Sequence, residues 1–354
     1  MIFEEFGKAY SRYTRRKKLM TLYVAVAAIL VSLLEIALGP YDIGFFEAYR
    51  VFIDHILGND PVSTLDDYVV WKKNTPRAIA VIAIGAGLGV CGAAMQSALR
   101  NPLADPYMTG IASGANFGVS LAAIAGIILI PAFTGDLGVI SNAFILALVP
   151  AIVIISISGI RHGSNSTTMI LVGIAVMYVF SAFTTMLKLS APTETFASVY
   201  AWSLGTLGSV GWTTLPYVIV ATVFGIILLY HMSVKLNLLS CSEDLAVSSG
   251  INPKNVRLIS IAVVSLVTAT LVCFTGTIGF VGLVAPHVMR IFLGSDNVYL
   301  IPATAACGAF VLAAADCIAI EITSTGLPVG VITSLIGGPL FIYILIKQHK
   351  NAWS

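Results

Sequence analysis

Long apolar stretches, rather than the alternating patterns of surface helices and strands, organise this chain. A helix needs about 20 mostly apolar residues to cross the ~30 Å hydrocarbon core of a bilayer. Stretches of that kind lie at about 19–39, 78–99, 111–131, 138–159, 166–189, 212–234, 256–275, 299–320 and 328–346. A shorter apolar segment at 283–293 is a further candidate. Counting it predicts about ten transmembrane helices, with both termini on one side of the membrane.

The distribution of Lys and Arg supports the count of ten. Cytoplasmic loops of membrane proteins carry an excess of these residues. With the N-terminus in the cytoplasm, 14 of the 19 Lys and Arg residues fall on the cytoplasmic side, and six of them precede residue 19. Without the span at 283–293, Lys347 and Lys350 would move outside and weaken the bias. The sequence therefore predicts that residues 1–18 and the C-terminus lie in the cytoplasm.

Composition excludes a water-soluble fold. Of the 354 residues, 58% are hydrophobic and only 10% are charged, whereas soluble domains carry about 25% charged residues. Lipid must cover most of the exterior, so we expect an all-α integral membrane protein. No soluble domain or low-complexity linker is visible, and residues 1–354 are expected to form a single transmembrane domain. The formal charge of +2 gives no reason to expect a nucleic-acid partner.

Residues that could perform catalysis are sparse. Ionisable side chains inside spans are costly and usually functional, and those expected within the membrane are sparse: Glu35, His287, Asp316 and Glu321, mostly near the ends of predicted spans. The five cysteines show no metal-ligand spacing and are expected to pack as small apolar residues. No nucleophile or paired-carboxylate motif occurs, and no Gly-x-x-x-x-Gly-Lys-Ser/Thr loop is present to bind ATP phosphates. We therefore expect no enzyme activity, cofactor or metal site; if ATP drives transport, another polypeptide hydrolyses it.

Two glycine-rich segments interrupt the apolar stretches. The glycines of residues 85–92 fit close helix packing, which small residues permit in lipid. The second set, Gly276, Gly279 and Gly282, sits where a span ends and the chain turns back. It fits either packing or a broken helix that borders a water-filled path. His287, directly after Pro286, is either a helix-end residue bonded to backbone or a ligand or gate residue.

Residues 238–251 read as a short cytoplasmic helix between two spans. Ser240 with Glu243 three residues later forms a capping-box pattern, and Gly250 suits the C-terminal end. Such a helix could present apolar side chains to a neighbouring protein, or it could pack on its own membrane domain, and the pattern leaves both open. The side chains expected to face a neighbour are Leu239, Leu245 and Ala246.

Four blocks, ordered along residues 19 to 347, resemble one transporter family. They are residues 98–115, 240–250, 276–296 and 327–339. In sequence, order and spacing they are similar to the iron-chelate and vitamin B12 permeases of ABC transporters, the FecCD family. The first block matches the family's cytoplasmic loop through Arg100, Asn101, Pro102, Asp105 and Pro106.

The resemblance implies a vitamin B12 permease-like fold of the type II ABC importer class. It implies a permease subunit that forms the translocation pathway for an iron chelate, either a siderophore or haem. The expected partners are a second copy of the chain or a related permease, two ABC ATPase subunits and an extracytoplasmic substrate-binding protein. The expected location is the cytoplasmic, or inner, cell membrane.

The resemblance also assigns roles to residues. Residues 238–251 resemble the coupling helix that seats in a groove of the ATPase, which implicates Leu239, Ser240, Glu243, Leu245, Ala246 and Gly250. The third block resembles the pathway or gate segment, which implicates Gly276, Gly279, Phe280, Gly282, Pro286 and His287.

One departure from the family concerns binding-protein docking. The family usually carries Arg-x-Pro-Arg where this chain has Asn74 to Arg77, so only Arg77 of the two charges is kept. Lys73 is expected to replace the missing arginine. We therefore assign docking to Lys73 and Arg77, at a site whose details differ from those of the family.

Several alternatives stay open at this point. Cobalamin and molybdate are the other substrate classes. A secondary carrier or channel that works without an ATPase would need a buried acidic or basic pair essential for transport. A structural membrane scaffold would move no solute at all.

Overall fold

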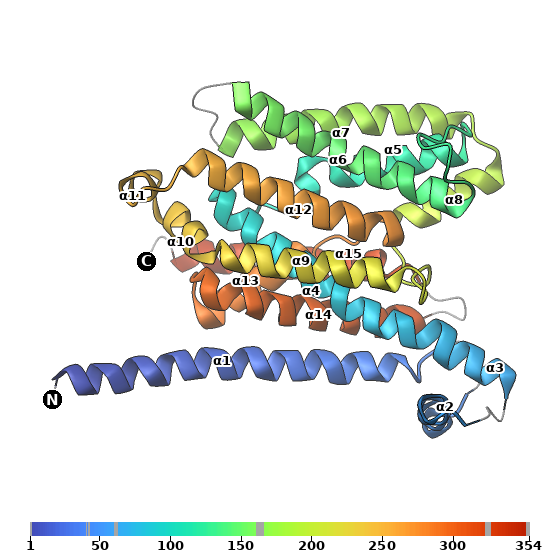
Figure 1. The fold of residues 1–354 in the computed structure, drawn as a ribbon, viewed down its shortest axis with the longest axis horizontal. Coiled ribbons are helices and arrows are strands. Elements are labelled where there is room, and N and C mark those ends of the chain that lie inside the picture. Colours follow the sequence, from blue (N-terminus) through green and yellow to red (C-terminus); the bar gives the residue numbers. More distant parts are fainter. Residues whose placement is uncertain are drawn as a thin grey trace.

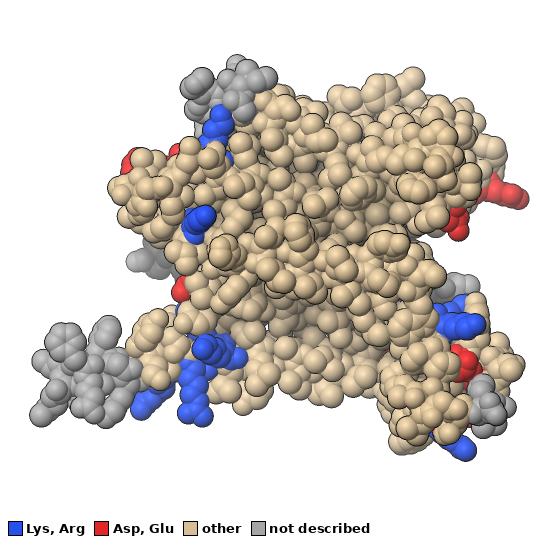
Figure 2. Space-filling view, viewed as in Figure 1, with Lys and Arg blue, Asp and Glu red and all other residues tan. Residues whose placement is uncertain are grey.

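The computed structural model describes residues 2–39, 41, 43–59, 63–160, 166–322 and 327–351. Within these ranges every regular element is a helix, and no strand occurs. The predicted all-α fold is confirmed. Its long helices run roughly parallel through one bundle (Figure 1). Side chains of Lys, Arg, Asp and Glu gather at the two ends of the bundle, and a wide band between them carries almost none (Figure 2).

A helix lies at each of the ten predicted apolar stretches. Among the described residues, six helices are long and apolar enough to cross a membrane alone, and α9 with α10, bent by 56°, counts as a seventh if the pair is one span. Three apolar helices, α5, α13 and the apolar part of α15, are shorter. The ten are α1 (Ile2–Glu35), α4 (Thr75–Leu99), α5 (Ile111–Ala123), α6 (Asp136–Ile160), α7 (Ser166–Leu189), α9 (Leu215–His231), α12 (Pro253–Thr275), α13 (Val281–Leu293), α14 (Asn297–Glu321) and α15 (Val329–Asn351).

One predicted span ends early. The stretch at 111–131 was expected to be helical throughout, but α5 stops at Ala123. Gly126 then takes a left-handed conformation at φ 68°, and Pro131 follows. Glycine adopts this conformation without steric cost, and proline cannot continue a helix. Apolar residues 124–131 therefore form a loop.

Helix α4 is the centre of the bundle and contacts α9, α12, α13 and α14. Its glycines allow direct backbone contact: a Cβ atom on Gly85 would lie 2.4 Å from the carbonyl oxygen of Gly308, and one on Gly92 would lie 1.7 Å from that of Gly282. No side chain fits at either position. The predicted packing role of the 85–92 glycines is confirmed.

The remaining helices lie at the ends of the bundle (Figure 1). We call the end where α1 begins the N face and the opposite end the far face. The N face carries α10 (Ser233–Cys241) and α11 (Glu243–Ser248), and the far face carries α2 (Phe45–Leu57), α3 (Thr64–Asp67) and α8 (Thr193–Ser203).

A π-helical turn, Tyr68–Asn74, joins α3 to α4. Pro76 stands in the first turn of α4. Proline has no N–H group, and its ring clashes with the carbonyl group four residues earlier, so a normal helical turn cannot lead into it. Thr75 completes the wider turn, because both its N–H and its hydroxyl group donate to the carbonyl oxygen of Val70.

Candidate functional site

A concave surface of about 850 Å³ lies between α5, α7, α15 and the turn that follows α12. None of the residues that line it, all within the described ranges, carries a charge. Its chemistry is that of hydroxyl, amide and small apolar groups, which suits a bulky solute better than a bare ion. The polar and small lining residues include Ser113, Asn116, Ser181, Thr277, Gly279 and Ser334.

The turn from α12 to α13 shapes one wall of this surface. Gly276 has a φ of 70°, and a Cβ atom there would lie 2.0 Å from the carbonyl oxygen of Trp202. Phe280 also has a positive φ, 67°, which is rare for a bulky residue. Its side chain lies against Gly337 of α15, where an added Cβ atom would be 2.5 Å from the Cβ atom of Phe280. Gly276, in a conformation that suits glycine, and the strained Phe280 thus hold the turn between α8 and α15.

The other predicted gate residues lie behind this turn. Gly282 faces α4, while Pro286 and His287 are buried within α13. The ring of His287 meets that of Phe341 edge-on at 6.1 Å. Of the six residues assigned to the pathway, only Gly279 lines the concave surface; the others support it from behind. The close contacts of Gly276 and Gly282 agree with the packing interpretation, while the pathway role of Gly279 stays a prediction.

The loop after α4 reaches the same turn from the N face. Asn101 forms a side-chain turn by accepting from the N–H of Leu103, and Arg100 ends α4 in a left-handed conformation at φ 51°. Asp105 caps the short 3₁₀ helix Pro106–Thr109 by accepting from the N–H of Tyr107 at 2.8 Å. Asn101 and Asp105 thus shape the loop as turn and cap residues.

The second half of this loop is not at the surface, although it was expected to be a cytoplasmic loop. Asp105 and Pro106 are buried and lie against Gly282. The hydroxyl oxygen of Tyr107 accepts from the N–H of Ile278 at 3.3 Å. Burial raises the pKa of the Asp105 carboxyl to about 6, and the N–H of Tyr107 opposes that shift. Loop and turn therefore form one packed unit.

The short helix on the N face begins two residues later than predicted. Ser242, not Ser240, caps α11: its hydroxyl oxygen accepts from the N–H of Leu245 at 3.0 Å. Helix α10 continues through Cys241, so Ser240 is still helical and donates to the carbonyl oxygen of Asn237. The predicted capping box of Ser240 with Glu243 is wrong. Gly250, with a φ of 77°, follows the end of the helix as expected.

Burial also changes the set of side chains that α11 can offer to a partner. Leu239 and Ala246 are fully buried in the chain, so the expectation that they face a neighbour is wrong. Leu245 is 42% exposed, and Val247, which the sequence pattern missed, is 61% exposed. The exposed apolar surface of this helix is therefore Leu245 with Val247.

Two polar anchors, neither apparent from the sequence pattern, hold this segment to the long helices. Glu243 forms an ion pair with Arg257 in the first turns of α12, and Arg257 Nε donates to the carbonyl oxygen of Ala98 at 3.1 Å. Asn237 of α10 donates to Asp296 Oδ1 at 2.7 Å and accepts from the N–H of Asn297 at 2.7 Å. The sequence signals that could have indicated these residues are an arginine inside an apolar stretch and the Asp296-Asn297 pair at the start of α14.

The two docking candidates on the far face differ in availability. Arg77 forms a bidentate pair with Asp316 of α14, Nε to Oδ2 and Nη2 to Oδ1, both at 2.7 Å. Its role is to join α4 to α14, and the expectation of a free docking cation does not hold for it. Lys73 is exposed and donates to the hydroxyl oxygen of Tyr41 at 3.2 Å. Lys73 remains the docking candidate.

The chain is similar to known transporter subunits over nearly its whole length. Residues 26–347 match the model of the FecCD transport family. A Helicobacter pylori protein named as an iron chelatin transport system permease is 31% identical over 94% of this chain and 99% of its own length. A cobalamin import system permease of Halobacterium salinarum is 36% identical over 80% of this chain and 75% of its own length.

A solved structure shares the fold. The chain of an inward-facing, metal-chelate type ABC transporter superposes with a TM-score of 0.78 at 26% sequence identity. The match covers 94% of this chain and 99% of that one. The relationship therefore extends over the complete helical bundle.

Proposed function

This chain belongs to the FecCD transport family of ABC importer permeases, and on that premise we propose that it forms the translocation pathway for an iron chelate, a siderophore or haem. The observation that carries the proposal is the uncharged concave surface of about 850 Å³. A chelate hides the charge of its metal inside an organic shell, so its path needs shape and hydrogen-bonding groups rather than fixed charges. The relative named for iron chelatin transport supports this substrate class.

Cobalamin is the second candidate. It is also a bulky metal chelate, and a relative named for cobalamin import shares 36% identity with this chain. That alignment covers less of both proteins than the alignment with the iron chelatin relative. Molybdate is disfavoured, because a small dianion would call for cationic groups along the path, and the concave surface has none.

The proposed assembly contains two permease chains, two ATPase subunits and a binding protein. The ATPase subunits would meet the N face, where Leu245 and Val247 of α11 are exposed. The binding protein would meet the far face, where Lys73 is exposed. Residues 1–354 would form one permease domain in the inner cell membrane, with residues 1–18 and the C-terminus cytoplasmic. The accumulation of Lys and Arg toward the N face supports this orientation.

The coupling path would run through the two polar anchors of the N face. Closure of the ATPase subunits on ATP would displace α11, and Arg257 would transmit the displacement to α12 and α4. Asn237 would transmit it to α14. If two states of the bundle differ by only a few kcal/mol, displacing these contacts is enough to shift the bundle between access to one side of the membrane and access to the other. ATP hydrolysis would belong to the separate ATPase chains.

Co-purification followed by reconstitution tests the proposal. The chain, tagged and extracted from its native membrane in mild detergent, should carry a stoichiometric ATPase with a phosphate-binding loop. In liposomes, the complex should take up a ⁵⁵Fe-siderophore or haem only with ATP, and radiolabelled cobalamin is the matched comparison. Cobalamin uptake alone would transfer the substrate assignment to cobalamin. A chain that purifies alone and moves solute without ATP would establish a secondary carrier instead.

A further inference from the structure

Helix α2 lies across the bundle instead of along it. In Figure 1 the long helices run horizontally, and α2 is seen end-on at the far face, close to the end of α1. Helix α1 ends at Glu35, near the end of the predicted span 19–39, and α2 begins ten residues later at Phe45. A helix perpendicular to a membrane span, next to the point where that span ends, lies parallel to the membrane surface.

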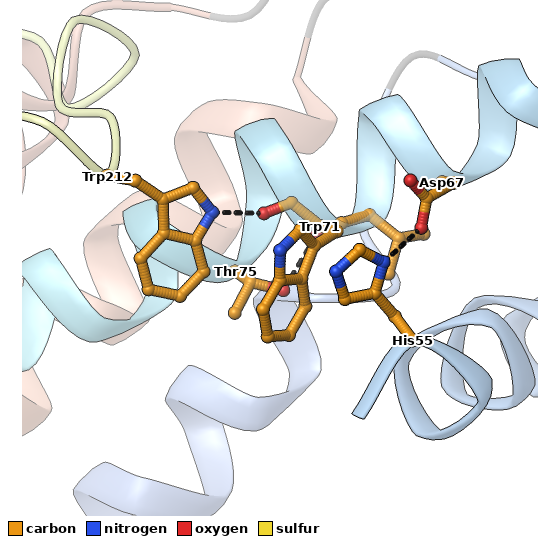
Figure 3. Close-up of polar contacts among 6 residues, drawn as sticks. His55, Asp67, Trp71, Thr75 and Trp212 are labelled. Atoms are coloured by element: carbon orange, nitrogen blue, oxygen red, sulfur yellow. Dashed lines mark hydrogen bonds and ion pairs between the residues drawn. The ribbon is translucent and has the colours of Figure 1, made fainter. Parts of the chain in front are cut away.

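One side of α2 is fixed to the bundle. Ala48 and Val51 are buried against Val70 of the π-helical turn. The ring of His55 stacks on that of Trp71 at 4.1 Å, and His55 Nδ1 lies 2.6 Å from Asp67 Oδ1 (Figure 3). Trp71 in turn accepts, through its carbonyl oxygen, a hydrogen bond from the indole of Trp212 at 2.8 Å. The orientation of α2 about its own axis is therefore set.

A second side of α2 is apolar and uncovered. Its exposed side chains are Phe46 at 85%, Ile53 at 52%, Ile56 at 59% and Leu57 at 68%. Water would make this exposure unfavourable, by about 25 cal/mol for each Å² of apolar surface. The adjoining side carries the charged residues Glu47, Arg50 and Asp54, and Arg50 and Asp54 lie 3.7 Å apart.

Two contacts show which way these sides point. The hydroxyl group of Tyr49 donates to the carbonyl oxygen of Leu33 at 2.8 Å, and Leu33 lies inside the α1 span. Phe52 lines an apolar groove with Ile29 and Leu33, also within that span. At about 100° per residue, Arg50 and Asp54 project roughly 100–160° away from Tyr49 and Phe52. The charged side therefore points away from the membrane core, and the apolar side adjoins it.

We propose that α2 is an interfacial helix whose exposed apolar side inserts into the lipid leaflet at the far face. Helices with segregated apolar and charged sides bury the apolar side at the boundary between acyl chains and headgroups. Aromatic side chains favour this depth, and Phe45, Phe46 and Tyr49 occupy it here.

The surroundings of α2 select lipid over a protein partner. Through Tyr49 and Phe52, α2 adjoins α1 at Leu33, a residue of the exposed apolar surface that Leu33 forms with Leu30 and Leu34. Helix α1 is an outer helix, since only 17% of its apolar window is buried. In Figure 1 the helices α5 and α7, which line the concave surface, lie on the opposite side of the bundle. Helix α2 is thus remote from the proposed pathway and borders lipid.

Spin labels on the two sides of α2 test the proposal in the full chain reconstituted in phosphatidylcholine and phosphatidylglycerol liposomes. Cys241, the exposed native cysteine, is first replaced by serine. Phe46→Cys, Ile53→Cys or Leu57→Cys then places a label on the apolar side, and Glu47→Cys is the matched control one residue from Phe46. Collisions with oxygen, which concentrates in lipid, and with a water-soluble nickel chelate are measured for each label.

The expected result is a several-fold preference for oxygen over the nickel chelate at positions 46, 53 and 57, and the reverse at position 47. A nickel preference at all four positions would overturn the proposal, because the apolar side would then face water. Poor access of both reagents at 46, 53 and 57 would also overturn it, since another protein, including a second copy of the chain, would cover the helix. Three independent apolar positions keep the test decisive if one variant fails to fold. None of these outcomes depends on the transported solute, so the test stands apart from the proposed function.

Discussion

Glu243 at the start of α11 is paired with Arg257 at the start of α12, and the same guanidinium group binds the last turn of α4 through the carbonyl oxygen of Ala98. The side chain of Arg257 is only 3% exposed, while that of Glu243 is 46% exposed. A half-exposed acid on a peripheral helix thus neutralises a buried cation between two long helices. Any movement of α11 changes the electrostatic environment of that cation.

Removing this pair should uncouple ATP hydrolysis from uptake. Glu243→Arg places a second cation beside Arg257, and we expect a several-fold loss of solute transported per ATP hydrolysed in reconstituted complex. Glu243→Asp keeps the charge and should retain most of the coupling. Asp244→Asn, a change at the exposed neighbouring acid, is the control. Normal coupling in Glu243→Arg would show that α11 acts without this pair.

The exposed apolar pair of α11 should bind the ATPase subunit. We expect Leu245→Ala with Val247→Ala to reduce the amount of ATPase that co-purifies with the tagged chain. Truncated apolar contacts at protein interfaces cost on the order of 1–2 kcal/mol each, which corresponds to roughly tenfold in affinity per residue. Val234→Ala, at an exposed position of α10, should have no effect. Equal ATPase recovery from the double variant and from the parent would place the contact elsewhere.

The buried pair of Arg77 and Asp316 should matter more when one member is removed than when both are. Leaving a buried charge unpaired costs about 3–5 kcal/mol, whereas replacing both charges by apolar residues is often neutral. Arg77→Met should therefore lower the thermal unfolding midpoint in detergent by several degrees, and Asp316→Leu in addition should restore most of it. Lys73→Met, at an exposed cation on the same face, is the control. A double variant as unstable as the single one would mean that hydrogen bonding, not charge neutralisation, dominates at this site.

Alanine should not be tolerated at the crossing of α4 with α13. In Gly92→Ala the new methyl group would lie 1.7 Å from the carbonyl oxygen of Gly282. Overpacking of this kind costs typically 1–3 kcal/mol, so we expect a clear drop in thermal stability and in the yield of folded protein. Gly211→Ala is the matched control, because no atom lies within 4 Å of a Cβ atom there. Comparable stability of the two variants would show that α4 and α13 can separate.

Asp105 should make stability depend on pH. Its pKa is raised to about 6 in the fold from about 3.9 in an unfolded chain, so the folded state binds the proton more tightly. Its contribution to stability is therefore present below pH 4 and lost as the pH rises through 6. Asp105→Asn keeps the acceptor for the N–H of Tyr107 and should flatten this dependence in thermal unfolding measured from pH 4 to 7. Asp244→Asn should leave the dependence unchanged.

Apolar patterning predicted the spans because lipid imposes it along the whole length of each helix. Features set by a few atoms were harder to predict. Ser240 and Ser242 both suit a helix N-terminus, and only the length of α10 decides between them. The pair of Arg77 and Asp316 joins residues 239 positions apart, and one sequence gives no measure of that proximity. Helix α2 lies between the first two predicted spans and was not predicted, because its three-sided pattern matches neither a span nor a surface helix with one apolar and one polar side.

The central place of α4 has a consequence for how the protein is made. In the span that contains it, Thr64–Leu99, 83% of the most apolar window is buried by other helices. Its covering partners α13 and α14 are encoded about 200 residues later, a delay of roughly 10–40 s at ordinary rates of synthesis. During that interval α4 must persist in the nascent membrane protein with lipid in place of its final neighbours. Its backbone contacts at Gly85 and Gly92 close only when the C-terminal third of the chain arrives, so assembly is completed by the last helices to be inserted.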